Sequence, residues 1–257
     1  MIVEIVPVLG DNYAYLVGCE QSGQAAAVDP ADADAVAQRA EALGLRLVAV
    51  WSTHHHGDHT MGNRELARRL PGLKVYGHAL ERDSIPALTD PLEHGSTIEI
   101  GGLQVEALHT PGHTRGSVCY RVQDALFSGD TLFAAGCGRL FEGDPSTMFR
   151  SLHEVIGPLP PETRVFCGHE YTEKNLDFAW SVEPDCPALQ ARIEAVRALR
   201  ARGEPAVPFS LADEHATNPF LRVERAAIQE GLRQRFGAGG LDPLGVFTRL
   251  RELRNSF

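Results

Sequence analysis

The chain has 257 residues, of which 43% are hydrophobic and 23% are charged. This length suits one large domain, or one domain with a smaller appendage, and the composition is typical of a globular protein with a sizeable core. The formal net charge of −10 argues against a nucleic-acid-binding surface. No apolar run approaches the roughly 18 residues that a membrane-spanning helix needs, so we expect no membrane partner.

The cysteines and the N-terminus predict a cytoplasmic location. The five cysteines are scattered along the chain and form no CxxC pair, as expected for reduced thiols. The first residues, MIVEIVPVLGDNYAYLV, lack the basic segment and the small-residue cleavage site of an export signal.

The first two-thirds of the chain alternate strand and helix patterns. Apolar runs predict strands over 1–9, 13–19 and 24–30, followed by a helix over 31–43 and a buried strand over 45–53. The next expected elements are a helix over 63–70, a strand over 73–78, a hairpin over 97–108, paired strands over 117–122 and 125–130, a helix near 146–156 and a strand over 163–169.

The pattern changes after about residue 172. Helical periodicity covers 187–202, 224–236 and 246–254, with prolines breaking the chain between the first two. We therefore expect a β-rich catalytic domain over 1–172 and a small helical domain over 173–257. Residues 221–257 carry seven Arg and no Lys against four acidic residues, which indicates either a solvated basic helix surface or a site for a small anionic ligand.

The segment His54-His55-His56-Gly57-Asp58-His59 directly follows the predicted strand over 45–53. Side chains two apart in an extended segment point the same way, so His54 and His56 can converge while His55 points away. Gly57 permits a turn that brings Asp58 and His59 towards a neighbouring point. Imidazole nitrogen and carboxylate oxygen are ligands for zinc-like cations, and four of them within six residues can serve two ions.

Three more candidate ligands lie at the ends of predicted strands. His113 lies in HTPGHT, Asp130 in LFSGDT and His169 in VFCGHE. Each follows a glycine, whose small size lets the backbone approach a crowded site. Each alone would suit a turn or a cap, but together they supply the ligands that the first segment lacks.

The pattern HxHxDH, followed by His, Asp and His at strand ends, resembles the metallo-β-lactamase superfamily. The resemblance implies an α+β fold, a four-layer αββα sandwich with the ligands along one edge. It also implies that His54, His56 and His113 bind one metal, that Asp58, His59 and His169 bind the other, and that Asp130 bridges the two. The other six histidines are interpreted as core or surface residues. Zinc is the favoured metal, with iron or manganese left open.

Further motifs narrow the resemblance. The segments AAGCGRLFEGD, GHEYTEKNLDFA, TNPFLR and RLRELRNSF are similar to those of the glyoxalase II (hydroxyacylglutathione hydrolase) family, over nearly the whole chain. The resemblance implies that a metal-bridging hydroxide, with Asp58 and Asp130 as catalytic residues, hydrolyses S-(2-hydroxyacyl)glutathione thioesters, chiefly S-D-lactoylglutathione, in methylglyoxal detoxification. We expect a monomer whose partner is this small thioester.

The same resemblance implies a glutathione site formed by Arg139, Tyr171, Arg251 and Arg254. Arg presents a planar fork that suits the carboxylates of glutathione. The family often has Lys where this chain has Arg139 and Tyr where it has Phe141, so we expect weaker substrate affinity than is usual for the family. Asp29, at the end of a predicted strand, is either a hydrogen-bond partner of a ligand histidine or a turn or N-cap residue.

Other functions remain as alternatives. A persulfide dioxygenase of the same fold would use one iron and O₂, and the paired Arg of the C-terminal region argue against it. A nuclease is disfavoured by the acidic charge, and nothing marks the acyl pocket of a lactonase. A non-catalytic metal-binding or redox-partner protein is disfavoured by the hydrolytic ligand set, and a purely structural zinc site by the absence of Cys ligands.

Overall fold

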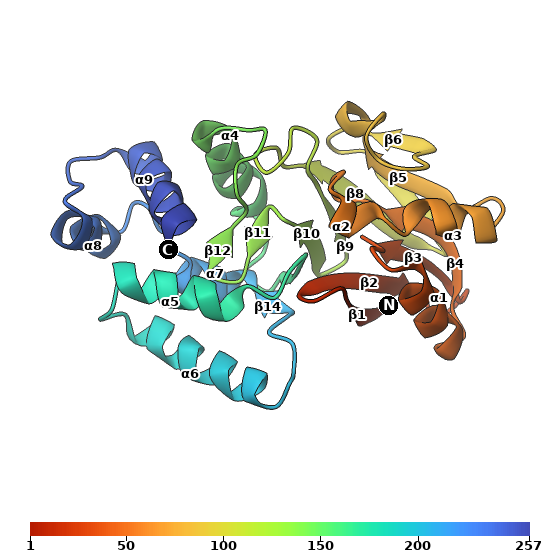
Figure 1. Ribbon diagram of the computed structural model, residues 1–257, viewed down its shortest axis with the longest axis horizontal. Helices are drawn as coiled ribbons and strands as arrows, with labels where there is room; N and C mark the ends of the chain where they lie inside the picture. The colour runs from red at the N-terminus through yellow and green to blue at the C-terminus, as the bar shows by residue number, and fades with distance from the viewer.

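The computed structural model describes residues 1–257, and its centre is a pair of six-stranded sheets (Figure 1). The first sheet has the order β1 (Ile2–Val8), β2 (Asn12–Gly18), β3 (Gln24–Val28), β4 (Arg46–Trp51), β5 (Lys74–His78) and β6 (Asp90–Leu92). Strands β1 to β3 pair antiparallel, whereas β3 to β6 pair parallel. The parallel strands therefore all end at one edge of this sheet.

The second sheet has the order β14 (Phe209–Ser210), β13 (Arg164–Cys167), β10 (Ala125–Gly129), β9 (Val118–Val122), β8 (Leu103–His109) and β7 (Thr97–Ile100). Its pairs are antiparallel except for β10 with β13. A short hairpin of β11 (Leu132–Phe133) and β12 (Gly136–Cys137) follows β10.

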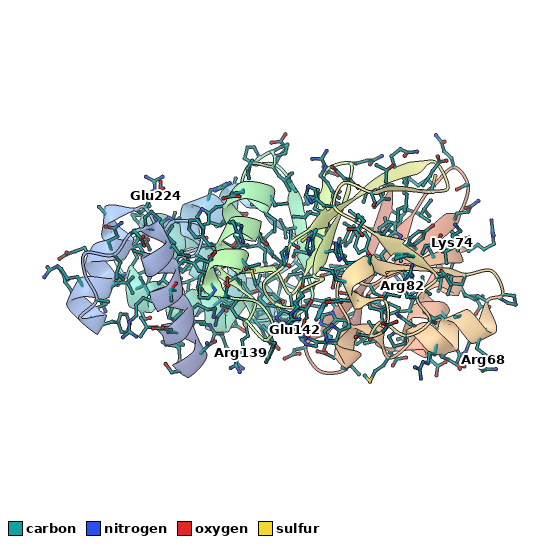
Figure 2. All side chains as sticks on the ribbon, turned by 90° about the horizontal axis from the view of Figure 1, so that it is seen from above. Arg68, Lys74, Arg82, Arg139, Glu142 and Glu224 are labelled. Carbon is teal, nitrogen blue, oxygen red and sulfur yellow. The ribbon has the colours of Figure 1, made fainter.

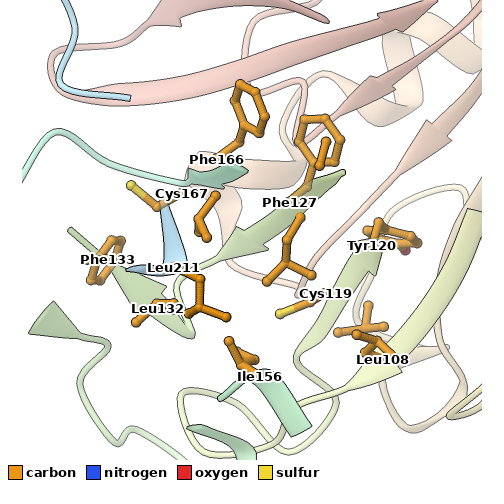
Figure 3. Close-up of a cluster of buried hydrophobic side chains, with 14 of the residues drawn as sticks. Leu108, Cys119, Tyr120, Phe127, Leu132, Phe133, Ile156, Phe166, Cys167 and Leu211 are labelled. Carbon is orange, nitrogen blue, oxygen red and sulfur yellow. The ribbon is translucent and has the colours of Figure 1, made fainter. Parts of the chain in front are cut away.

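The largest apolar core, of 44 buried residues, draws on the strands of both sheets and on the helices that pack against the second one. The rings of Phe127 and Phe166, from the adjacent strands β10 and β13, stack with centroids 5.0 Å apart (Figure 3). Tyr15 of the first sheet packs against both rings, at 5.4 Å from each. These contacts hold the strand ends of the two sheets in fixed relation to each other.

Helices cover the outer faces. A separate core of 16 buried residues joins α1 (Ala33–Ala42) and α3 (Asn63–Arg69) to the first sheet. Between β4 and α3 lies the short α2 (Gly57–Thr60), and a 3₁₀ turn, η1 (Ala79–Glu81), follows β5. On the second sheet, α4 (Pro145–Arg150) continues into the π-helical turn η2 (Ser151–Ile156), and buried Met148, Leu152 and Ile156 belong to the 44-residue core.

The C-terminal region gathers at the opposite end of the molecule from α1 and α3 (Figure 1). It contains α5 (Thr172–Val182), α6 (Pro187–Ala201), α7 (Leu211–Thr217), α8 (Ala226–Phe236) and α9 (Pro243–Ser256). None of the helices in the chain is both long and apolar enough to cross a membrane.

The predicted αββα sandwich followed by a helical region is confirmed, with some differences in its elements. Several elements are additional to the sequence prediction: the helices α2, α5 and α7, the turn η1 and the strands β6, β11, β12 and β14. Strand β14 lies within the C-terminal region yet pairs with β13 of the second sheet. The domain division at residues 172 and 173 stays a prediction.

A buried ion pair ties the helices to the β11–β12 hairpin. Glu214 of α7 is fully buried and accepts hydrogen bonds from the backbone N–H of Ala135 and from Arg192 of α6. Burial raises the pKa of Glu214, although the Arg192 charge opposes this change. The pair therefore depends on both partners, because either charge left alone would be buried without compensation.

We predict that Arg192→Ala lowers the free energy of unfolding by about 3–5 kcal/mol, because it leaves the Glu214 carboxylate buried and unpaired. Urea unfolding would measure the loss. Arg197 of the same helix forms an exposed pair with Asp177, and Arg197→Ala should cost less than about 1 kcal/mol. Equal losses in the two variants would contradict the role given to the buried pair.

Candidate metal centre

The predicted ligands extend from the ends of four strands. His54, His56, Asp58 and His59 follow β4, His113 follows β8, Asp130 follows β10 and His169 follows β13. The loops after these strands meet at one edge of the sandwich, because Tyr15 and the Phe127–Phe166 stack hold the two sheets together there.

His54, His56 and His113 form what we call the first cluster. The His54 Nε2 and His113 Nε2 atoms each lie 3.0 Å from His56 Nδ1. His54 and His113 are buried, whereas His56 is partly exposed. His55 points away from this cluster, towards Glu81 and Glu142, as the strand alternation predicts.

Asp58, His59 and His169 form the second cluster. His59 Nε2 lies 3.2 Å from His169 Nε2, and Asp58 Oδ2 lies 3.4 Å from His169 Nε2. Both histidines are buried, but the Asp58 side chain is 43% exposed. One carboxylate of this cluster is therefore open to small molecules in the pocket.

Asp130 lies between the two clusters. Its carboxylate is 3.4 Å from His59, 3.5 Å from His169 and 3.5 Å from His113 of the first cluster. Its Oδ1 atom is buried and has no hydrogen-bond partner. The structure thus brings all seven predicted residues together, with the carboxylate placed to face both clusters.

The donor set fits two divalent cations. Several imidazole nitrogens face one another at 3.0–3.2 Å, where N–H groups cannot all find acceptors but lone pairs can share a cation. The unpartnered Asp130 Oδ1 atom requires compensation of the same kind. Five imidazoles and two carboxylates suit zinc, iron or manganese.

Glycine is required beside Asp130. A Cβ on Gly168 would lie 2.7 Å from His59 Cε1 and even closer to Asp130 Oδ1. Gly129 has a φ of +47° and packs against Thr53. The prediction that glycine lets the backbone approach the site closely is confirmed at Gly168, whereas Gly129 and Gly112 allow close packing on Thr53 and on Met148.

Carboxylates orient two of the buried histidines. Asp29 Oδ2 lies 2.9 Å from His59 Nδ1 and also accepts a hydrogen bond from the Thr53 hydroxyl, so the hydrogen-bond role weighed for Asp29 is the one that the structure supports. Asp11 Oδ1 lies 3.0 Å from His169 Nδ1. The sequence analysis missed Asp11, whose only signal was its position in the GDN turn.

The charges around the two clusters differ. In the absence of metal, burial lowers the pKa of His54, His56 and His113. Burial also opposes protonation of His59, but the Asp130 and Asp29 carboxylates outweigh it and raise its pKa to about 9. At neutral pH the first cluster is therefore neutral, whereas the second cluster holds a proton on His59.

A cavity of about 720 Å³ opens beside the two clusters. Its lining includes Asp58, Asp130 and His169 and all four residues predicted to bind glutathione, Arg139, Tyr171, Arg251 and Arg254. Lys174 and Asn175 of α5 also line it, and the sequence analysis did not single them out.

The four predicted substrate residues have different surroundings. The Tyr171 ring stacks on His169, with centroids 4.7 Å apart, and Arg139 is exposed on the loop after β12 (Figure 2). Arg251 is only 4% exposed and donates a hydrogen bond to the Cys137 carbonyl at 2.6 Å. Arg254 donates to Asn175 Oδ1 at 3.1 Å, and burial together with the nearby Arg251 charge lowers its pKa.

Phe141 lies at the rim of the cavity. It is 62% exposed, and its ring meets those of His56 and His113 edge-on at 5.4 and 5.3 Å. It provides an apolar wall beside the first cluster and offers no hydroxyl.

Comparisons with known proteins agree with this architecture. The family description "Metallo-beta-lactamase superfamily" matches residues 8–169, and "Hydroxyacylglutathione hydrolase C-terminus" matches residues 170–257. Proteins named hydroxyacylglutathione hydrolase are 48% identical in a Synechococcus strain, with 98% of each chain covered, and 44% identical in Rhodospirillum rubrum, with 98% of this chain and 97% of the relative covered.

Solved structures give the same fold. ETHE1 from Myxococcus xanthus has a TM-score of 0.69 at 26% identity, over 100% of this chain and 99% of its own. TTHA1623 in a di-iron-bound form has a TM-score of 0.55 at 31% identity, over 66% of this chain and 92% of its own.

Fold and donor set define a metal-dependent hydrolase of the metallo-β-lactamase type. Within that superfamily, the chain belongs to the hydroxyacylglutathione hydrolase family.

We predict that zinc binding to the second cluster releases a proton below about pH 9, because His59 must lose its proton to become a ligand. Affinity there should rise with pH and level off near pH 9. Affinity at the first cluster should stay constant between pH 7 and 9, since its imidazoles are already neutral. Calorimetry in buffers of different ionisation enthalpy would count the protons. Equal proton release from both binding events would contradict this assignment.

Proposed function

We propose that the chain hydrolyses S-(2-hydroxyacyl)glutathione thioesters, chiefly S-D-lactoylglutathione, to a 2-hydroxy acid and glutathione. The observation that carries the proposal is one cavity whose lining includes five of the seven metal-type donors together with a group of cationic side chains. The names and near-complete coverage of the relatives support the same reaction. In a cell this reaction would remove the thioester formed from methylglyoxal.

We propose the six residues of the two clusters, together with Asp130, as the seven ligands of two divalent ions. His54, His56 and His113 would hold one ion, Asp58, His59 and His169 the other, and Asp130 would contact both. Zinc is our favoured metal because imidazole and carboxylate groups are common zinc ligands. Iron is the alternative, because the similar structure TTHA1623 was solved in a di-iron-bound form. Bound there, the ions would supply an activated water and polarise the thioester carbonyl.

Asp58 is proposed to orient the attacking water. Asn12 holds its Oδ2 atom with a hydrogen bond of 3.1 Å, which leaves the other oxygen free to face the cavity. Burial would raise the pKa of Asp58, but His59 and the Asn12 amide outweigh it and lower the pKa, so the group is a carboxylate at neutral pH. It can therefore accept a hydrogen bond from water on the side of the substrate.

The cationic part of the cavity is proposed to bind the glutathione moiety. Arg139 and Arg254 offer planar, paired N–H donors for its carboxylates, and Tyr171 lines the same cavity. Arg251 contributes charge, but its main contact is with the Cys137 carbonyl, which it holds in place below the loop of Arg139. These cations give the acidic chain a local field that favours an anionic substrate.

We further propose a monomer that acts on this small thioester without nucleic-acid or membrane partners. The five free cysteines are consistent with the cytoplasm. Residues 1–172 would carry the metal ligands and residues 173–257 two of the arginines of the glutathione site, Arg251 and Arg254.

The direct test is the initial rate of thiol release from S-D-lactoylglutathione before and after chelation. We expect fast release that chelation abolishes and added zinc restores. Asp130→Asn should lose both activity and bound metal. Absence of release from metal-loaded protein would refute the substrate, and oxygen uptake on glutathione persulfide with one iron per chain would support the dioxygenase instead.

We predict that Arg254→Ala chiefly raises KM, by roughly 10-fold, because it removes an interaction made equally before and during the reaction. Arg251→Ala should also lower the melting temperature, since it leaves the buried Cys137 carbonyl without its donor. Steady-state kinetics and thermal unfolding would separate the two effects. An unchanged KM in Arg254→Ala would contradict the proposed glutathione site.

A further inference from the structure

Glu81 is a buried carboxylate outside the two metal clusters. It ends the η1 turn after β5 and is only 3% exposed. Its Oε1 atom accepts hydrogen bonds from the Thr114 hydroxyl and from the Gly116 N–H at 3.2 Å, while Oε2 has no partner. Thr114 directly follows His113, so Glu81 anchors the loop that carries a residue of the first cluster.

His55 lies between Glu81 and a second carboxylate. Its Nδ1 atom is 3.2 Å from Glu81 Oε1, and its Nε2 atom is 3.6 Å from Glu142 Oε1. The two nitrogens of one ring thus face two carboxylates on opposite sides. His55 is flanked in sequence by His54 and His56 of the first cluster.

Glu142 connects this group to the rim of the cavity. Its Oε2 atom accepts a hydrogen bond of 2.9 Å from the Arg115 N–H, on the same loop as His113. The backbone N–H groups of Phe141 and Glu142 both donate to the His113 carbonyl, at 3.2 and 3.4 Å. Side-chain and backbone hydrogen bonds therefore both hold the loop of Arg139 and Glu142 against the His113 loop.

These contacts have a common consequence for the first cluster. Its residues come from two loops that share no strand, one after β4 and one after β8. Glu81 contacts both loops, through His55 on one side and through Thr114 and Gly116 on the other. A buried carboxylate of this kind is costly unless its partners stay in place, so it favours one relative position of the two loops.

We propose that Glu81, acting with His55, is a positioning residue that sets the geometry of the His54–His56–His113 metal site. Through Glu142 the same group fixes the Arg139–Phe141 rim of the cavity. The inference rests on the proposed assignment of these three histidines to one metal. It concerns residues that touch neither metal nor substrate.

The test is zinc titration of the metal-free full-length protein in competition with a chromogenic chelator. Glu81→Gln keeps the shape of the side chain and removes its charge. We expect one of the two zinc ions to bind about 10-fold more weakly or worse, and the other to keep its affinity. His55→Gln should weaken the same ion, and the double variant should lose less than the two single losses combined, because both act through one contact.

Glu214→Gln is the matched control, because Glu214 is as deeply buried but contacts Ala135, Arg192 and Asn218 instead. It should lower the melting temperature and leave both zinc affinities unchanged. If Glu81→Gln does not fold, the zinc titration is made with His55→Gln, because the His55 side chain is partly exposed and its replacement disturbs the core less.

The two proposals fail in different ways. Wild-type protein that binds fewer than two zinc ions would refute the proposed metal centre itself. Two ions bound with wild-type affinity in Glu81→Gln and His55→Gln would overturn the positioning role alone. A third zinc equivalent in the wild type that disappears in Glu81→Gln would also overturn it, since His55, Glu81 and Glu142 would then themselves hold a cation.

Discussion

The Asp130 carboxylate lies within 3.5 Å of imidazole nitrogens of His59, His113 and His169, which come from three separate loops. Hydrogen-bonding or charged partners offset the cost of burying a carboxylate, and a shared charge stabilises buried imidazoles that face one another. Each group therefore stabilises the observed position of the others. The fold meets this constraint by ending β4, β8, β10 and β13 at one edge and by placing glycine before Asp130 and His169. The cavity opens at that edge.

The proposed substrate half of the site depends on contacts across the whole chain. Arg251 and Arg254 lie on the last helix, yet they donate hydrogen bonds to Cys137 on β12 and to Asn175 on α5. The β11–β12 hairpin is itself held by Glu214 of α7. A cationic surface assembled in this way can face the metal donors only when the C-terminal helices are docked. In this way a chain with net charge −10 would present arginines to the proposed anionic substrate.

Much of the fold and of the donor set could be predicted from the sequence, because those signals are local. Continuous apolar runs marked the strands, and alternation in His54–His56 separated His55 from the cluster.

The partners that orient these residues could not be predicted in the same way. Asp11 lies 158 residues from His169, and Glu81 meets Thr114 only through the packing of η1 against another loop. Strand β14 has two residues, too few for any periodicity. The buried hydrogen bond from Arg251 to the Cys137 carbonyl could not be predicted from the sequence either, because the charge of Arg251 suggested an exposed binding group.

Anomalous X-ray scattering from crystals of the zinc-loaded protein, collected at the zinc edge, tests the central claim most directly. The account predicts two peaks per chain about 3.5–4 Å apart, one against His54, His56 and His113 and the other against Asp58, His59 and His169, with Asp130 in contact with both. A single peak, or peaks away from Asp130, would contradict it.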